Sequence, residues 1–147
     1  MLECGIGGRK DATNIVNRPE CSAITSIGLD HVDVMGGTLD DIAYEKSGVI
    51  KSGIPCVIGP TCSDKKPILD YARAQNSELI VIPDQITHEH VNNAIVNEIM
   101  RVVCEKENVP FDYRNFVKGV SQPCRFERIK GTPQKIILDV CHNYQGI

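Results

Sequence analysis

The chain has 147 residues, of which 41% are hydrophobic and 24% are charged, and its formal net charge is −3. These values are close to those of ordinary globular domains and exclude wholesale disorder. No basic region stands out, which argues against nucleic acid as a partner, and no uncharged run is long enough to span a membrane. Because the first residues also lack the pattern of a signal peptide, we expect a cytoplasmic protein.

The predicted elements alternate between strands and helices along most of the chain. In order, they are a strand at 1–4, a strand at 22–27, a helix at 41–47, a strand at 55–58, a helix at 65–76, a strand at 78–82, a helix at 87–108, and strands at 125–129 and 135–140. Thr38 and Asp41 resemble a capping box that begins the first helix, and Gly48 is expected to end it. This alternation predicts an α/β fold with a mostly parallel sheet.

Three clusters of polar or glycine-rich sequence follow predicted strand ends, at 5–14, 30–31 and 139–143. Ligands of open parallel sheets bind beyond the carboxyl ends of the strands. The sequence therefore predicts a ligand site at this edge of the sheet.

The seven cysteines are odd in number, and no two have the C-x-x-C spacing of common zinc and redox sites. We interpret them as free thiols that behave as small buried apolar residues, which suits a reducing compartment. Cys141 lies beside His142, but neighbouring residues of a strand point to opposite faces, which disfavours a Cys–His nucleophile.

Glu3 lies at the end of one predicted strand and His31 follows another, and a carboxylate with an imidazole suits a divalent metal near phosphate oxygens. Each also has a plain structural explanation, as a salt-bridge partner and as a polar turn residue. Lys46 is either a solvated surface residue or an amine turned inward that could add carbon dioxide to form a carbamate. Residues 5–8 lack the G-x-G-x-x-G spacing, and no Gly-Lys-Ser/Thr loop is present, so the sequence predicts no triphosphate cradle of its own.

Taken together, five segments resemble conserved motifs of the folylpolyglutamate synthase and dihydrofolate synthase family, a branch of the Mur-type ATP-dependent ligases. They are LECGIGGRKDATN at 2–14, ITSIGLDH at 24–31, GTLDDIAYEKSGVIK at 37–51, RFE at 125–127 and DVCHN at 139–143. The departures are Cys124 in place of Gly, and Val140 and Cys141 in place of Gly and Ala.

The resemblance implies a partial Mur-ligase-type ATPase domain at 1–115 and, at 116–147, a linker with the first strands of a Rossmann-like C-terminal domain. The phosphate loop would precede Glu3, so we expect a central fragment of a longer protein, inactive alone. The implied reaction is ATP-dependent addition of L-glutamate to folate or dihydropteroate through an acyl phosphate, with magnesium (Mg²⁺) as cofactor. The alternatives are another Mur-type ligase and a non-catalytic remnant. For the longer protein, the resemblance also allows a mitochondrial form.

The resemblance also implies roles for single residues. Glu3, His31 and Lys46 (as its carbamate) correspond to metal ligands, and Asp11 and Asn14 correspond to substrate-binding residues. Lys46, Asp139 and His142 are the expected catalytic residues. Arg125, together with Asp139 and His142, is expected to close over the nucleotide.

Overall fold

The computed structural model describes residues 1–112, 127–129, 131 and 136–139. At its centre lies a parallel sheet of three short strands, β1 (Ser22–Ile24), β2 (Cys56–Ile58) and β3 (Leu79–Val81), in the order β1-β2-β3. The predicted parallel α/β architecture is confirmed. Each strand lies inside its predicted range and is shorter, because only three residues of each strand pair with a neighbour. After β1, residues 25 and 26 are exposed.

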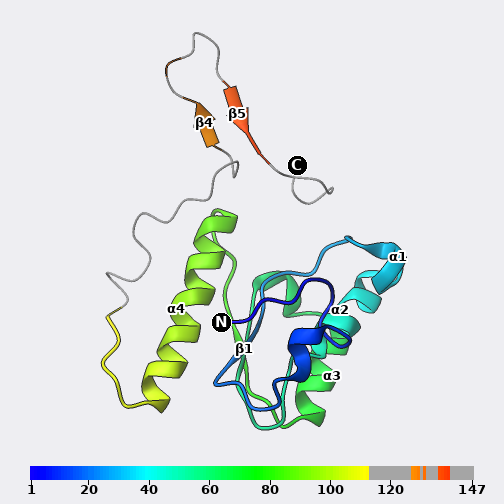
Figure 1. Cartoon of the computed structure of the whole chain (residues 1–147), viewed down its shortest axis with the longest axis vertical. Coiled ribbons are helices and arrows are strands. Elements are labelled where there is room, and N and C mark those ends of the chain that lie inside the picture. Colours follow the sequence, from blue (N-terminus) through cyan, green and yellow to red (C-terminus); the bar gives the residue numbers. More distant parts are fainter. Residues whose placement is uncertain (113–126, 130, 132–135, 140–147) are drawn as a thin grey trace.

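Helices cover both faces of this sheet (Figure 1). They are α1 (Val32–Met35), α2 (Leu39–Ser47), α3 (Lys66–Ala74) and α4 (His88–Lys106), with 3-10 turns η1 (Ala12–Ile15) and η2 (Pro60–Cys62). The α2 and α3 helices pack side by side, and α4 packs against β1 and β2. The predicted helices are confirmed to within two residues, whereas α1 was not predicted from the sequence.

The central strand divides the core into two layers. Side chains alternate between the faces of a strand, so Cys56 and Ile58 pack with residues of α2 and α3, whereas Val57 packs with Ile95 of α4. All three strand residues are fully buried. A strand that is apolar at every position is what a sheet covered on both faces requires.

The start of α2 follows the predicted capping box. The Thr38 Oγ1 accepts a hydrogen bond from the Asp41 backbone N–H at 3.1 Å, and the Asp41 carboxylate accepts one from the Thr38 backbone N–H at 3.1 Å. These bonds satisfy N–H groups that have no partner within a helix. The helix begins at Leu39, two residues before the predicted start.

The predicted strand at 1–4 is wrong. Residues 1–7 form no helix or strand, and the Met1 and Leu2 side chains are exposed. A strand exists only through hydrogen bonds to a neighbouring strand, and no other described backbone segment pairs with these residues.

The two C-terminal strands that the sequence predicts are present, as β4 (Glu127–Ile129) and β5 (Ile136–Leu138), and they pair in antiparallel fashion. The expected domain boundary at 115/116 lies outside the described residues. Among the described residues, none of the helices combines the length and the apolar character that crossing a bilayer would demand.

Candidate functional site

The loop at 5–14 folds around the carboxylate of Asp11. This carboxylate accepts hydrogen bonds from the backbone N–H groups of Gly5 (2.9 Å), Ile6 (3.4 Å) and Thr13 (2.8 Å), and from the Thr13 hydroxyl (2.5 Å). The Thr13 side-chain and backbone donors, followed by those of the glycine-rich turn, hold the pKa of Asp11 below its ordinary value. Asp11 is therefore ionised and fixes the shape of its own loop.

Asn14 ties the end of this loop to the end of α2. Its Nδ2 donates to the carbonyl oxygens of Arg9 (3.3 Å) and Gly48 (3.1 Å), and its own carbonyl oxygen accepts from the Lys51 Nζ (3.1 Å). The side-chain amide thus joins two segments of the fold. Its predicted contact with substrate stays a prediction.

Lys46 lies in the last turn of α2, half-buried. Within the described part of the chain, its ammonium makes no hydrogen bond or ion pair. Burial raises the pKa of the Cys62 thiol to about 11, and the nearby charge of Lys46 opposes this shift. Lys46 therefore lies near η2, which follows the carboxyl end of β2, the edge where the sequence predicts a ligand site.

Glu3 and His31 are exposed. His31 precedes α1 in the left-handed conformation (φ 47°, ψ 40°), and its Nε2 lies 3.9 Å from the Asp30 Oδ1. Left-handed backbone is uncommon outside glycine and costs free energy that the surrounding structure must offset. Glu3 makes no hydrogen bond or ion pair among the described residues, so its carboxylate is available.

The described residues include no group of three or more His, Cys, Asp or Glu side chains placed to hold a metal ion. Two donors of the expected type, Glu3 and His31, are nevertheless accessible, and carboxylate and imidazole groups suit a divalent cation. A third donor requires carbamylation of Lys46, whose amine has no anionic partner among the described residues. The residues present therefore fit the implied magnesium ion in chemistry.

Asp139 follows β5 and is exposed. Arg125 and His142, the other residues expected near the nucleotide, lie outside the described residues, as does the Cys141–His142 pair. Cys4, Cys21, Cys56, Cys62 and Cys104 are free thiols, which agrees with the interpretation of the cysteines, although only Cys56 and Cys62 are fully buried.

Two residues with unusual surroundings, Arg9 and Ser47, were not singled out from the sequence. The Arg9 guanidinium carbon lies 4.1 Å from the centroid of the Tyr44 ring and 4.6 Å from that of Tyr71. Its Nη2 donates to the Ser47 Oγ at 3.1 Å, and Ser47 is fully buried. The one sequence feature that pointed to Arg9 is that this basic residue lies within the glycine-rich motif.

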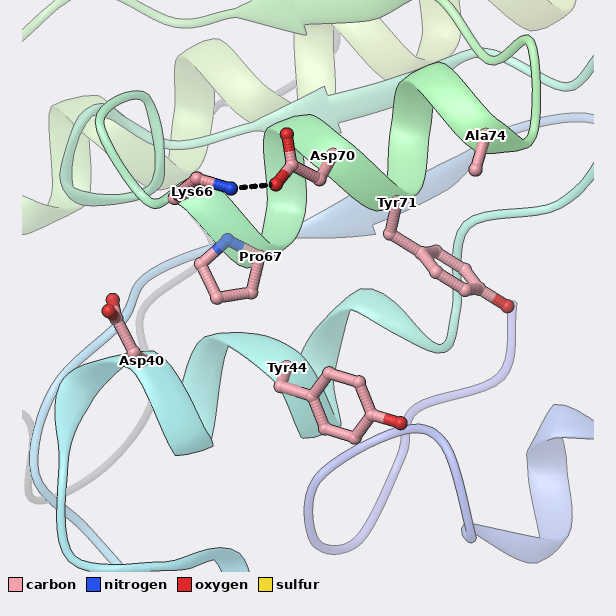
Figure 2. A pocket seen from close by; sticks show the side chains of 7 residues that line it. All are labelled: Asp40, Tyr44, Lys66, Pro67, Asp70, Tyr71 and Ala74. Atoms are coloured by element: carbon pink, nitrogen blue, oxygen red, sulfur yellow. Dashed lines mark hydrogen bonds and ion pairs between the residues drawn. The ribbon is translucent and has the colours of Figure 1, made fainter.

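A hollow of about 430 Å³ lies between α2 and α3 (Figure 2). Another, of about 400 Å³, lies beyond the carboxyl ends of β2 and β3 and is lined by Pro60, Thr61, Ser63 and the residues from Val81 to Asp84. Among the described residues, none of those predicted from the sequence to form the site lines either hollow.

The chain is similar in sequence to known proteins. No family model matches the chain. The chain is 32% identical over 127 residues to the "Probable folylpolyglutamate synthase" of Schizosaccharomyces pombe, which covers 76% of the chain and 25% of that protein. It is 51% identical over 89 residues to the dihydrofolate synthase/folylpolyglutamate synthase of Bacillus subtilis, covering 60% of the chain and 20% of that protein.

Two solved structures match almost the whole chain. A folylpolyglutamate synthase complex with AMPPCP and folate superimposes with a TM-score of 0.84 at 26% identity, over 99% of this chain and 44% of that one. A bifunctional folylpolyglutamate synthase/dihydrofolate synthase with Mn, AMPPNP and L-glutamate bound superimposes with a TM-score of 0.79 at 29% identity, over 99% and 40%.

The parallel sheet covered by helices and these superpositions define a Mur-ligase-like α/β protein. Within that class, the chain matches a segment of proteins named folylpolyglutamate synthase and dihydrofolate synthase, in sequence and in structure. It spans about a quarter of the length of the S. pombe relative and less than half of the matched structures.

Proposed function

We propose that the complete protein containing this chain is an ATP-dependent ligase that joins L-glutamate to folate, to dihydropteroate, or to both. The observation that carries the proposal is the superposition of 99% of the chain on an enzyme described with AMPPCP and folate. A second structure, described with Mn, AMPPNP and L-glutamate, supports the metal, the nucleotide and the amino acid.

The proposed chemistry proceeds in two steps. A carboxylate of the pteroate or folate attacks the γ-phosphorus of ATP, which forms an acyl phosphate and releases ADP. The neutral α-amine of glutamate then adds to the acyl carbon, and the tetrahedral adduct expels inorganic phosphate. One amide bond forms, one ATP is consumed, and the amine proton passes to solvent or a nearby base.

Glu3, His31 and the carbamate of Lys46 would hold the magnesium ion. When bound, the ion neutralises phosphate charge that develops during transfer. Among the residues that the structure describes, the Glu3 carboxylate and the Lys46 amine make no hydrogen bond or ion pair, which supports this assignment. Carbamylation replaces the positive charge of the amine with a negative one, which makes it an oxygen ligand.

Asp11 and Asn14 are proposed to lie at the substrate end of the site. Asp11 is held ionised and rigid by its four hydrogen bonds, so it keeps the loop that would face the substrate in one conformation. Asp139, Arg125 and His142 are proposed to act on the nucleotide and incoming amino acid from a second domain, with the boundary near residues 115 and 116.

The proposed compartment is the cytoplasm. A mitochondrial form is the alternative, because the folylpolyglutamate synthase of Bos taurus to which the chain is similar is mitochondrial.

The test is ADP release by the complete protein in the presence of Mg²⁺. We expect ADP release to require folate or dihydropteroate together with glutamate, and the product to gain the mass of one glutamate residue. A protein that instead consumes ATP with a muramyl substrate would belong to another branch of the ligases. ATP binding without turnover under any substrate pair would indicate a non-catalytic remnant.

A further inference from the structure

Arg9 is held between two aromatic rings that come from different helices. Its guanidinium carbon lies 4.1 Å from the Tyr44 ring centroid and 4.6 Å from the Tyr71 ring centroid. Figure 2 shows Tyr44 on α2 and Tyr71 on α3, with both rings extending toward the same side. A guanidinium within about 6 Å of a ring centroid is attracted by the negative face of the ring. Arg9 therefore has attractive contacts with two helices at once.

Hydrogen bonds fix the same residue to the end of α2. The Arg9 Nη2 donates to the Tyr44 carbonyl oxygen at 3.2 Å and to the Ser47 Oγ at 3.1 Å. Its backbone N–H donates to the Glu45 carbonyl oxygen at 2.9 Å. The buried Ser47 hydroxyl in turn donates to the Tyr44 carbonyl oxygen at 2.7 Å. Two of these partners, Glu45 and Ser47, are the residues directly before and after Lys46 in the sequence.

The hydrogen bonds of Asp11, unlike those of Arg9, stay within the loop. All four of its donors belong to the loop itself, so Asp11 fixes the shape of the loop and does not attach it to α2. Attachment to α2 comes from Arg9 and from the Asn14 Nδ2 that donates to the Gly48 carbonyl oxygen. Removing the Arg9 contacts would therefore let an intact loop shift relative to Lys46.

We propose that Arg9 is a positioning residue, which fixes the loop carrying Asp11 against the helix end carrying Lys46. The inference rests on the proposed function, since it assigns Asp11 to the substrate and Lys46 to the metal. Displacement of about 1 Å between groups that act on one substrate is enough to reduce turnover greatly.

The test uses Tyr71, which lies on α3 and outside the proposed site. In the complete protein, Tyr71→Leu removes the ring over Arg9 but keeps an apolar side chain, and Tyr71→Phe keeps the ring. We expect Tyr71→Leu to lower kcat and to raise KM for the folate substrate about fivefold, with KM for ATP within twofold. Tyr71→Phe should match the wild type. Equal behaviour of the two variants, or equal increases in both KM values, would overturn the inference.

A second measurement does not depend on activity. Amide hydrogen exchange in the segment 5–16 of the complete protein should be about tenfold faster in Tyr71→Leu and in Ser47→Ala than in Tyr71→Phe. Unchanged exchange in both variants would refute the positioning role, whatever the enzyme does. Faster exchange in a protein that never uses folate would preserve the role of Arg9 in holding the loop and refute the proposed function instead.

Discussion

Gly48 and Arg9 pack backbone against backbone. A Cβ atom on Gly48 would stand 2.4 Å from the Arg9 Cα and 2.8 Å from the Arg9 backbone nitrogen. Gly48 has φ −59°, an ordinary helical value, so its backbone conformation does not require glycine. The requirement comes from the close approach of the loop at 5–14 to the end of α2.

The first prediction concerns this contact. Gly48→Ala should lower the free energy of unfolding by about 2–3 kcal/mol, because the added methyl group must displace backbone atoms in a packed site. The measurement is urea unfolding followed by circular dichroism. Gly37→Ala is the control: a Cβ there meets no atom within 4 Å, and we expect a change within about 0.5 kcal/mol. Equal effects of the two substitutions would show that the close approach is not maintained in solution.

The second prediction concerns the Asp11 carboxylate. The Thr13 hydroxyl is the largest cause of its lowered pKa, so Thr13→Val should raise the pKa of Asp11 toward the ordinary 3.8. The measurement is an NMR titration of the Asp11 side-chain carboxyl carbon. The backbone N–H bonds remain in this variant, so the return should be incomplete. A pKa that does not move would mean that the hydroxyl bond is absent in solution.

The lowered pKa of Asp11 also determines the direction in which stability changes with pH. Because the folded protein binds the Asp11 proton more weakly than the unfolded chain does, the ionised carboxylate stabilises the fold above pH 3.8. That contribution is lost as the pH falls through the lowered pKa. Thr13→Val should therefore show a smaller loss of stability from this group below pH 3.8.

The third prediction concerns the buried thiols. Burial raises the pKa of Cys56 to about 12 and that of Cys62 to about 11. Iodoacetamide reacts with thiolates, so at pH 8 it should modify the half-buried Cys4 and Cys104 and leave Cys56 and Cys62 unmodified. Peptide mass spectrometry measures each site, and a sample in urea, where all should react, is the control. Labelling of Cys56 in the folded protein at the rate of Cys104 would contradict the buried position.

The raised pKa values of the two thiols also determine how stability changes at alkaline pH. In the unfolded chain they ionise near pH 9, whereas the folded protein retains both protons to higher pH. Their contribution to stability is thus complete below pH 9 and is lost as the pH rises toward 11 and 12.

The fold could be predicted from the sequence wherever local signals and burial agree. The Thr38–Asp41 capping box and the apolar spacing of α4 predicted these two helices to within two residues at each end. The prediction was wrong at 1–4, because an apolar composition is not enough to form a strand without a pairing neighbour. It also missed α1, a single turn whose preceding His31 has a left-handed backbone that no local pattern announced.

The candidate site was predicted only in part. Asp11 and Lys46 were singled out by their place in motifs along the chain, and their roles stay predictions. Arg9 could not be interpreted, since its partners Tyr44 and Tyr71 follow it by 35 and 62 residues in a sequence without any local link between them. Its importance depends on α2 and α3 packing side by side, which is a property of the tertiary fold.

The fourth prediction concerns Lys46 in the complete protein. If its carbamate is a metal ligand, Lys46→Ala should reduce kcat at least about 100-fold, because a ligand oxygen near the phosphates is lost. Small carboxylates such as acetate should restore part of the activity by filling the space with an oxygen donor. Lys51→Ala is the matched control: Lys51 follows the same helix and donates to the Asn14 carbonyl oxygen, so its loss should affect stability. Added acetate should not change the activity of this variant.

His31→Ala should raise the magnesium concentration needed for half-maximal activity. Unchanged kinetics in Lys46→Ala would refute the carbamate, and an unaltered magnesium curve would remove His31 from the metal site.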